Sequence, residues 1–176
     1  MRRFTTVAAA VLALTPVLAQ AAEPPCLSPG EFTALAEYAL PSMISGTSQR
    51  CSSALGPSAY LPRQGAQLAQ RYAERRTAAW PGAKAAFLKL SATTNADANS
   101  LIRTMPDASL QQMLAALMEG MVAQQVPLDR CVMLDRVIGL LSPLPAQNTA
   151  ELIALAIGLG AKTGCAKLGA ISVCAA

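Results

Sequence analysis

The sequence predicts an all-α protein: a single-domain orthogonal bundle of about six to seven helices, stapled by disulfides. Apolar residues recur at helical spacing in most segments, and helix-start signals precede several of these segments. Alternating apolar and polar residues do not extend far enough anywhere to predict a long strand. Five cysteines follow an N-terminal export pattern, which indicates a cross-linked chain in an oxidising compartment.

Residues 1–21 have the pattern of a cleaved secretory signal peptide. Arg2 and Arg3 form a basic start, an apolar run extends over residues 7–18, and Ala19-Gln20-Ala21 gives a small-x-small cleavage site. The apolar run is shorter than the ~20 residues that a membrane-spanning helix needs. We therefore expect a periplasmic or secreted protein with no transmembrane segment after cleavage, and one helical domain over residues 22–176.

The first helix is predicted by Ser28-Pro29-Gly30-Glu31, a capping box with proline at the first helical position. Apolar residues continue along one face as far as Ile44. Pro41 lies within this face, so we expect a kink or a break between two short helices. A turn at Gly56-Pro57-Ser58 then separates this region from the next helix.

The middle of the chain reads as three helices. One begins near Gln64, and Trp80-Pro81-Gly82 separates it from a second that ends at a polar loop over residues 91–95. A short third helix ends before Pro106. Trp80 could stack on a ligand, but a lone tryptophan at a helix junction more often anchors the core.

The longest regular apolar pattern predicts a helix from Asp107 to about Val126, with Asp107 as its N-cap and Pro127 barring continuation. We expect this helix to form the centre of the bundle. Its methionine-rich stripe (Met113, Met118 and Met121, with Met133 nearby) has a second interpretation, an adaptable binding groove. The apolar positions are Leu110, Met113, Leu114, Leu117, Met118, Met121 and Val122.

Two further helices and a tail complete the prediction. The helix after Pro127 carries Cys131 on its apolar face, so this cysteine should be buried near a partner. A capping-box-like start at residues 148–151 opens a helix that is apolar all round over residues 152–159, which predicts an enclosed position. We expect the tail to be tethered by at least one cysteine, with residues 170–174 as a short extended piece.

The five cysteines are assigned a structural role. Because five cannot all pair within one chain, one thiol should stay free or bridge to a second molecule. Five choices of that thiol, each with three pairings of the other four, stay open. There is no C-x-x-C pair and no histidine, so thioredoxin-like redox chemistry, zinc sites and other metal or cofactor sites are not expected. The candidates are Cys26, Cys51, Cys131, Cys165 and Cys174.

Charge is distributed unevenly along the chain. Two of the 14 basic residues belong to the export signal, which leaves 12 basic against 10 acidic residues. Basic residues concentrate between residues 50 and 89, which suggests either a face for an anionic partner or an ordinary solvated helix surface. Nucleic acid is not expected, because no aromatic residues alternate with these charges. The candidate basic face comprises Arg63, Arg71, Arg75, Arg76, Lys84 and Lys89.

Catalytic motifs are largely excluded by composition. The absence of histidine removes Ser-His-Asp and Cys-His catalysis, and no Ser-x-x-Lys occurs. The remaining option is a carboxylate pair, Glu31 with Glu37 or Asp129 with Asp135. Six residues correspond to about 600° of helical rotation, so neither pair shares a face cleanly, and surface ion pairs are the favoured explanation of these residues.

These observations predict a non-enzymatic exported protein that binds another envelope protein or a peptide. The alternative is a small-ligand or lipid binder with an apolar cavity under the methionine-rich stripe. A less favoured alternative is a carboxylate-dependent hydrolase. The sequence does not indicate the oligomeric state.

Overall fold

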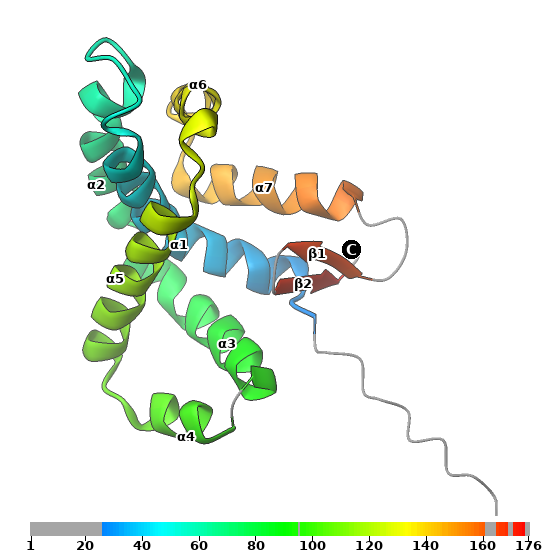
Figure 1. Ribbon diagram of the computed structural model, residues 1–176. Coiled ribbons are helices and arrows are strands. Elements are labelled where there is room, and N and C mark those ends of the chain that lie inside the picture. The colour runs from blue at the N-terminus through cyan, green and yellow to red at the C-terminus, as the bar shows by residue number, and fades with distance from the viewer. Residues whose placement is uncertain (1–25, 95, 161–164, 169–170, 175–176) are drawn as a thin grey trace, which may run out of the picture.

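The computed structural model describes residues 26–94, 96–160, 165–168 and 171–174 (Figure 1). The predicted signal peptide, residues 1–21, lies outside the described residues. The predicted helical bundle is confirmed, with two disulfides. In chain order the elements are α1 (Pro29–Cys51), η1 (a π-helix, Leu61–Gly65), α2 (Ala66–Ala73), α3 (Arg76–Thr94), α4 (Ala96–Thr104), α5 (Asp107–Gln125), η2 (a 3₁₀-helix, Leu128–Arg130), α6 (Cys131–Leu141), α7 (Ala146–Gly160), β1 (Cys165–Leu168) and β2 (Ile171–Cys174).

The centre of the bundle is α1, and α2, α3, α5 and α7 all pack against it (Figure 1). Leu35, Tyr38, Leu40 and Ile44 are all buried although they point to different sides of this helix. The expectation that α5 forms the centre is therefore wrong. Helix α5 buries one face only, whereas α1 has partners around its circumference.

Helix α1 begins as predicted. The Ser28 hydroxyl accepts a hydrogen bond from the Glu31 backbone N–H at 3.2 Å, and the Ser28 backbone N–H donates to the Glu31 carboxylate at 2.8 Å. The predicted kink or break at Pro41 does not divide the element, because α1 continues to Cys51. Pro41 is itself buried, and the helices packed around α1 offset the one backbone hydrogen bond that proline cannot make.

Helix α3 is longer than predicted. It runs through Pro81 and ends at Thr94, so it includes residues 91–94 of the expected polar loop; residue 95 lies outside the described residues. Ala79, Ala83 and Ala86 are buried along one side, which explains how packing outweighs the proline and glycine signals. Trp80 anchors the core, as the second interpretation held: it is 6% exposed and its ring centroid lies 5.2 Å from that of Tyr38.

Helix α5 approaches α1 closely at Gly46. A Cβ atom at Gly46 would lie 2.6 Å from the Glu119 carbonyl oxygen and 3.0 Å from the Val122 Cβ atom. Asp107 is the first residue of α5, not its N-cap, and Pro106 occupies the cap position. The Asp107 carboxylate contacts α3 instead, where it accepts from the Trp80 indole N–H at 2.9 Å.

Helix α7 packs on α1 through one side only. Ala146 and Ala150 are buried, whereas Leu152 and Leu155 are 47% and 62% exposed. The prediction of an enclosed helix is therefore wrong. Residues 152–159 are all apolar, so this part of the sequence carries no sign of which side meets α1 and which side meets solvent.

The disulfides join segments far apart in the sequence. Cys51–Cys131 links the end of α1 to the start of α6, and Cys26–Cys174 links the segment before α1 to β2. The expected burial of Cys131 beside a partner cysteine is confirmed, since both Cys51 and Cys131 are fully buried. The two bonds use four cysteines and leave Cys165 as the fifth.

The C-terminal tail is tethered, as predicted. Strands β1 and β2 form an antiparallel pair in which Cys165 lies opposite Cys174. Leu27 extends this pair: its N–H donates to the Ser172 carbonyl at 2.8 Å, and its carbonyl accepts from the Cys174 N–H at 2.8 Å. None of the helices that the structure describes combines the length and the apolar character that a membrane crossing requires.

Candidate functional site

Most of the candidate basic face is engaged within the chain. Lys84 pairs with Asp107 at 2.5 Å, Lys89 with Glu31 at 2.8 Å, and Arg75 with Glu37 at 3.2 Å. Arg71 donates to the Ser142 carbonyl and lies over the Tyr72 ring. Arg76 contacts α1, and Arg63 is exposed on η1. The six residues are thus spread over separate contacts and do not form one open cationic surface.

Two of these ion pairs shift the titration of their acids. A hydrogen bond from Lys84, followed by one from Trp80, lowers the pKa of Asp107. A hydrogen bond from Lys89, followed by the Ser28 backbone N–H, lowers the pKa of Glu31. Both shifts favour the ionised acid, which is typical of a structural contact at a helix start and not of a proton donor.

The candidate carboxylate pairs are engaged separately. Glu31 contacts Lys89, whereas Glu37, two turns further along α1, contacts Arg75. Asp129 lies 3.7 Å from Arg130. Asp135 accepts the Tyr60 and Leu61 backbone N–H groups at 3.2 and 2.6 Å, so it anchors η1 to α6. Within the described residues, no group of three or more acidic, cysteine or histidine side chains could hold a metal ion.

The methionine-rich helix exposes a large part of its apolar surface. Leu110 and Leu114 are buried, but Met113, Leu117 and Met121 are 42%, 52% and 48% exposed. We call these three residues the methionine face. The expectation that they form core is therefore wrong for these three residues, whereas Met118 of the same stripe packs against the core. The reason is geometric: α5 meets α1 near Gly46 through the neighbouring side of the helix, and spacing by four residues keeps the methionine face in one exposed row.

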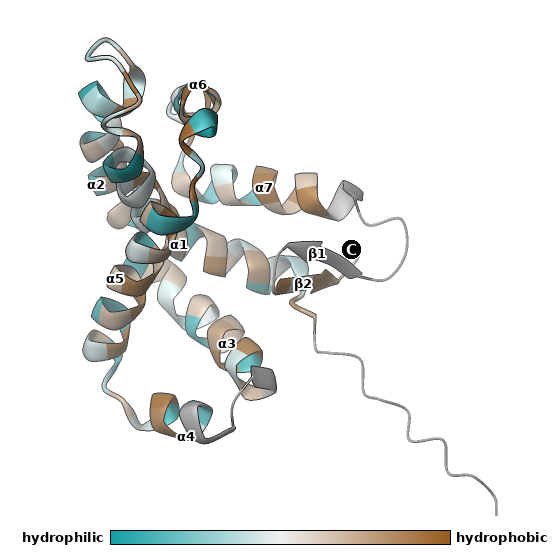
Figure 2. Cartoon of the chain, in the orientation of Figure 1, coloured by the Kyte–Doolittle hydropathy of each residue, from teal (hydrophilic) through white to brown (hydrophobic). Residues whose placement is uncertain are grey.

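The following helices also contain strongly hydrophobic residues (Figure 2), and several of these residues are exposed. Isolated exposed leucines are normal on protein surfaces. A row of exposed apolar residues along one helix, with further exposed apolar residues on the next two helices, is unusual. Helix α6 exposes Val132, Met133, Val137 and Leu140, and α7 exposes Leu152 and Leu155.

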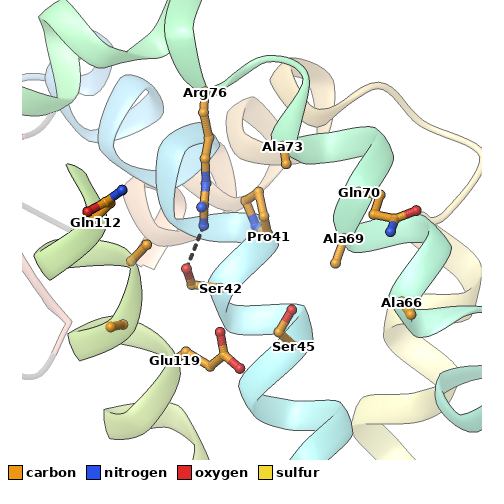
Figure 3. Close-up of a pocket in the computed structure, with 12 residues that line it drawn as sticks. Pro41, Ser42, Ser45, Ala66, Ala69, Gln70, Ala73, Arg76, Gln112 and Glu119 are labelled. Carbon is orange, nitrogen blue, oxygen red and sulfur yellow. Dashed lines mark hydrogen bonds between the residues drawn. The ribbon is translucent and has the colours of Figure 1, made fainter. Parts of the chain in front are cut away.

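On the opposite flank of α5, a groove of about 570 Å³ lies between α1, α2 and α5 (Figure 3). Ser42 and Ser45 of α1 line its floor, and Arg76 reaches in from the start of α3. Glu119 lies on the α5 wall, and most other lining residues are small. The remaining residues of the lining are Pro41, Ala66, Ala69, Gln70, Ala73, Gln112, Ala115 and Ala116.

Within the groove, the Arg76 guanidinium is held in place by α1. Its Nε–H donates to the Tyr38 carbonyl at 3.3 Å, its Nη2 donates to the Ser42 hydroxyl at 2.5 Å, and it lies 5.3 Å from the centre of the Tyr38 ring. Glu119 is partly buried and forms no ion pair or side-chain hydrogen bond with any residue that the structure describes. Glu119 lies on the polar side of its helix by periodicity, which gives no sign that α2 and α3 complete a groove there.

No protein-family model matches the chain, and comparisons with curated proteins and with solved structures find no match.

Proposed function

We propose that this chain is an exported, non-catalytic helical protein that binds another envelope protein, or a peptide segment of one, on its methionine face. The observation that carries the proposal is the exposed row of Met113, Leu117 and Met121 on a helix whose other side is packed. Contiguous exposed apolar surface is typical of protein interaction sites.

The chemistry of the methionine face favours an apolar helix as the partner. Methionine side chains are flexible and polarisable, so a methionine-rich surface adapts to partners of varied shape. Spacing by four residues matches the apolar stripe of an amphipathic helix laid alongside α5. The partner is therefore expected to present leucine, isoleucine or phenylalanine at helical spacing.

Export to the periplasm or the medium is part of the proposal. The pattern of residues 1–21 is that of a secretory signal, and the two disulfides fit an oxidising compartment. Together they support a partner in the cell envelope.

A small-ligand binder is the second candidate, and the groove between α1, α2 and α5 favours it. Its volume of about 570 Å³ lies within the usual range of ligand sites. The groove is open and carries Arg76 and Glu119, so it differs from the apolar cavity that was expected under the methionine stripe. The hydrolase alternative gains no support from the separate contacts of Asp129 and Asp135.

The proposal is tested by cross-linked co-purification from the cell envelope, with non-reducing mass analysis. The test variant replaces Met113, Leu117 and Met121 by glutamine, which keeps helix propensity and removes apolar surface. The matched control is Leu101→Gln, because Leu101 is an exposed leucine on α4, outside the methionine face. We expect the wild type and the control to recover the same partner in stoichiometric amount, and the triple variant to recover at least about tenfold less.

Two outcomes would contradict the proposal. One is equal recovery of the partner by the wild type and the triple variant. The other is flotation of the wild type, but not the triple variant, with phosphatidylethanolamine–phosphatidylglycerol vesicles when no protein is recovered, which would assign the face to lipid.

A further inference from the structure

The groove between α1, α2 and α5 holds two opposite charges that do not pair. Arg76 and Glu119 both line it and both are partly buried (Figure 3). The ion pairs of the described residues are Arg75–Glu37, Lys84–Asp107, Lys89–Glu31 and Arg130–Asp129, and they include neither group. Partial burial of a charge costs free energy unless a partner compensates it.

Arg76 retains donors that α1 does not use. A guanidinium carries five N–H donors in a planar fork, and the Tyr38 carbonyl and the Ser42 hydroxyl take one each. The centre of the Tyr38 ring lies 5.3 Å from the Arg76 guanidinium and helps to hold this group in place. Because the side chain is already ordered, binding a carboxylate would cost little further conformational entropy.

Glu119 supplies the complementary charge on the facing wall. It comes from α5, whereas Arg76 comes from the start of α3, and Ser42 and Ser45 lie on the floor between these elements (Figure 3). Alanine side chains from α2 and α5 line much of the remaining wall, which leaves room for an extended chain. The volume of about 570 Å³ suits a ligand larger than one or two atoms.

We propose that this groove binds a zwitterionic ligand of the amino acid or short-peptide class, with its carboxylate on Arg76 and its ammonium group on Glu119. Such a ligand compensates both charges at once, which neither an anion nor a cation alone would do. The site lies on the flank of α5 opposite the methionine face, so the inference does not depend on the protein-binding role.

The test is calorimetric and NMR titration of the disulfide-bonded protein with Ala-Ala-Ala that has free termini. Its N-acetyl and C-amide forms each remove one charge, and free alanine distinguishes an amino acid from a peptide as the ligand. We expect each cap to weaken binding at least about tenfold, the usual scale for a hydrogen bond to a charged group. Tighter binding of the tripeptide than of alanine assigns the site to peptides, and the reverse assigns it to amino acids.

Variants connect each charge to its end of the ligand. In Glu119→Gln, the free and N-acetylated tripeptides should bind equally, whereas the C-amide should still bind more weakly. Arg76→Gln should bind the free and C-amide tripeptides equally and should still bind the N-acetylated form more weakly. Arg76→Lys should restore part of the preference for the free tripeptide over the C-amide. The matched controls, Glu151→Gln and Arg103→Gln, alter exposed charges on α7 and α4 and should behave as the wild type.

Arg76 also contacts Tyr38, so its replacement could disturb folding. Glu119→Gln removes no described side-chain hydrogen bond or ion pair. If the Arg76 variants do not fold, the binding of the capped and free tripeptides to Glu119→Gln decides the proposal. The proposal is overturned if the tripeptide and alanine cause no heat and no shift of groove resonances at millimolar concentration. Equal binding of free and capped tripeptides to the wild type would overturn it too.

Discussion

Tyr38 connects three helices with one side chain. Its hydroxyl donates to the Gln111 carbonyl of α5 at 3.0 Å, and its ring packs against Trp80 of α3. The residue is 1% exposed, and burial raises the pKa of its hydroxyl, partly offset by the nearby Arg76 charge. A neutral hydroxyl at this place holds α1, α3 and α5 in one arrangement.

Removal of the Tyr38 hydroxyl should therefore destabilise the fold. We predict that Tyr38→Phe lowers the free energy of unfolding by about 1 kcal/mol, because the Gln111 carbonyl loses its buried donor. The measurement is urea unfolding followed by circular dichroism. Tyr60→Phe is the matched control, since no hydrogen bond of the Tyr60 hydroxyl occurs in the described part of the chain. Equal stability of Tyr38→Phe and Tyr60→Phe would contradict the assignment.

The ion pair of Glu31 with Lys89 should make stability depend on acid pH. The pKa of Glu31 is lowered below its usual value of 4.5, so its ionised form stabilises the native state. This contribution is present above about pH 4.5 and is lost as the pH falls through the lowered pKa. We predict that Glu31→Gln is less stable than the wild type at pH 7 by up to about 1 kcal/mol.

The difference in the free energy of unfolding between Glu31→Gln and the wild type should shrink toward zero near pH 3. Urea unfolding at a series of pH values measures it. Glu74→Gln is the control, because Glu74 is exposed and lies outside the ion pairs of the described residues. A difference that stays constant with pH would show that the charge of Glu31 contributes nothing.

Residues whose partners are close in sequence were the predictable ones. The Ser28 and Glu31 capping box lies within one turn and was predicted correctly. Asp107 was expected to cap its own helix, but its carboxylate contacts Trp80 and Lys84 of α3. Local pattern identifies the polar group at a helix start and not the distant donor that competes for it.

At the scale of elements, the contact between α1 and α5 depends on a missing side chain. An alanine at Gly46 would place Cβ against the Glu119 backbone, so the helices would have to separate. We predict that Gly46→Ala lowers the free energy of unfolding by about 1–3 kcal/mol. Thermal and urea unfolding test this value.

Gly120→Ala is the matched control for Gly46→Ala. Gly120 also lies within a helix, but nothing lies within 4 Å of a Cβ atom built there. Alanine is the better helix former, so this control should raise stability by about 0.5–1 kcal/mol. Opposite signs for the two substitutions are expected, and stabilisation by both would contradict the close packing of α1 on α5.

Element type was largely predictable, whereas the packing of the elements was not. Helical periodicity correctly located α5 and α6, and Pro41 and Pro81 wrongly suggested interruptions of α1 and α3. Proline removes one hydrogen bond, and packing against several neighbours outweighs that loss. A regular apolar stripe favoured α5 as the centre, whereas the helix that packs against most of the others is α1, whose apolar stripe gave no sign of how many of its sides are buried.

At the scale of the whole molecule, the disulfide between Cys51 and Cys131 closes a long loop. The two residues are 80 positions apart, and the bond holds α6 to the end of α1. We predict that replacing both by serine lowers the free energy of unfolding by about 2–5 kcal/mol. Cys165→Ser is the control and should leave stability near that of the wild type, because neither disulfide includes Cys165.

Alkylation under denaturing, non-reducing conditions checks the same assignment. Mass analysis should recover peptides joined through Cys51–Cys131 and Cys26–Cys174, with Cys165 alkylated. The sequence predicted two bonds and one remaining thiol, but it did not predict their connectivity. Pairing depends on which helix ends meet, and that information arises only from the assembled bundle.

The candidate binding surfaces were the least predictable part of the molecule. The six basic residues were identified as a group, yet five of them contact acceptors within the chain. The methionine stripe was noticed, but periodicity does not distinguish a face that meets α1 from a face that meets solvent. Exposure is a property of the assembly, so only the structure shows which apolar residues of α5 meet solvent.

Site-specific photo-cross-linking shows whether the methionine face contacts a partner protein. A photoreactive amino acid replaces Leu117 in one variant and Leu101 in the control, since both leucines are more than half exposed. We predict that only the probe at position 117 traps a partner protein, through an apolar segment of that partner. Excess wild-type protein without the probe should compete for the partner and reduce trapping, and the triple glutamine variant should not. Equal trapping at both positions, or competition by the triple variant, would contradict a binding role of the methionine face.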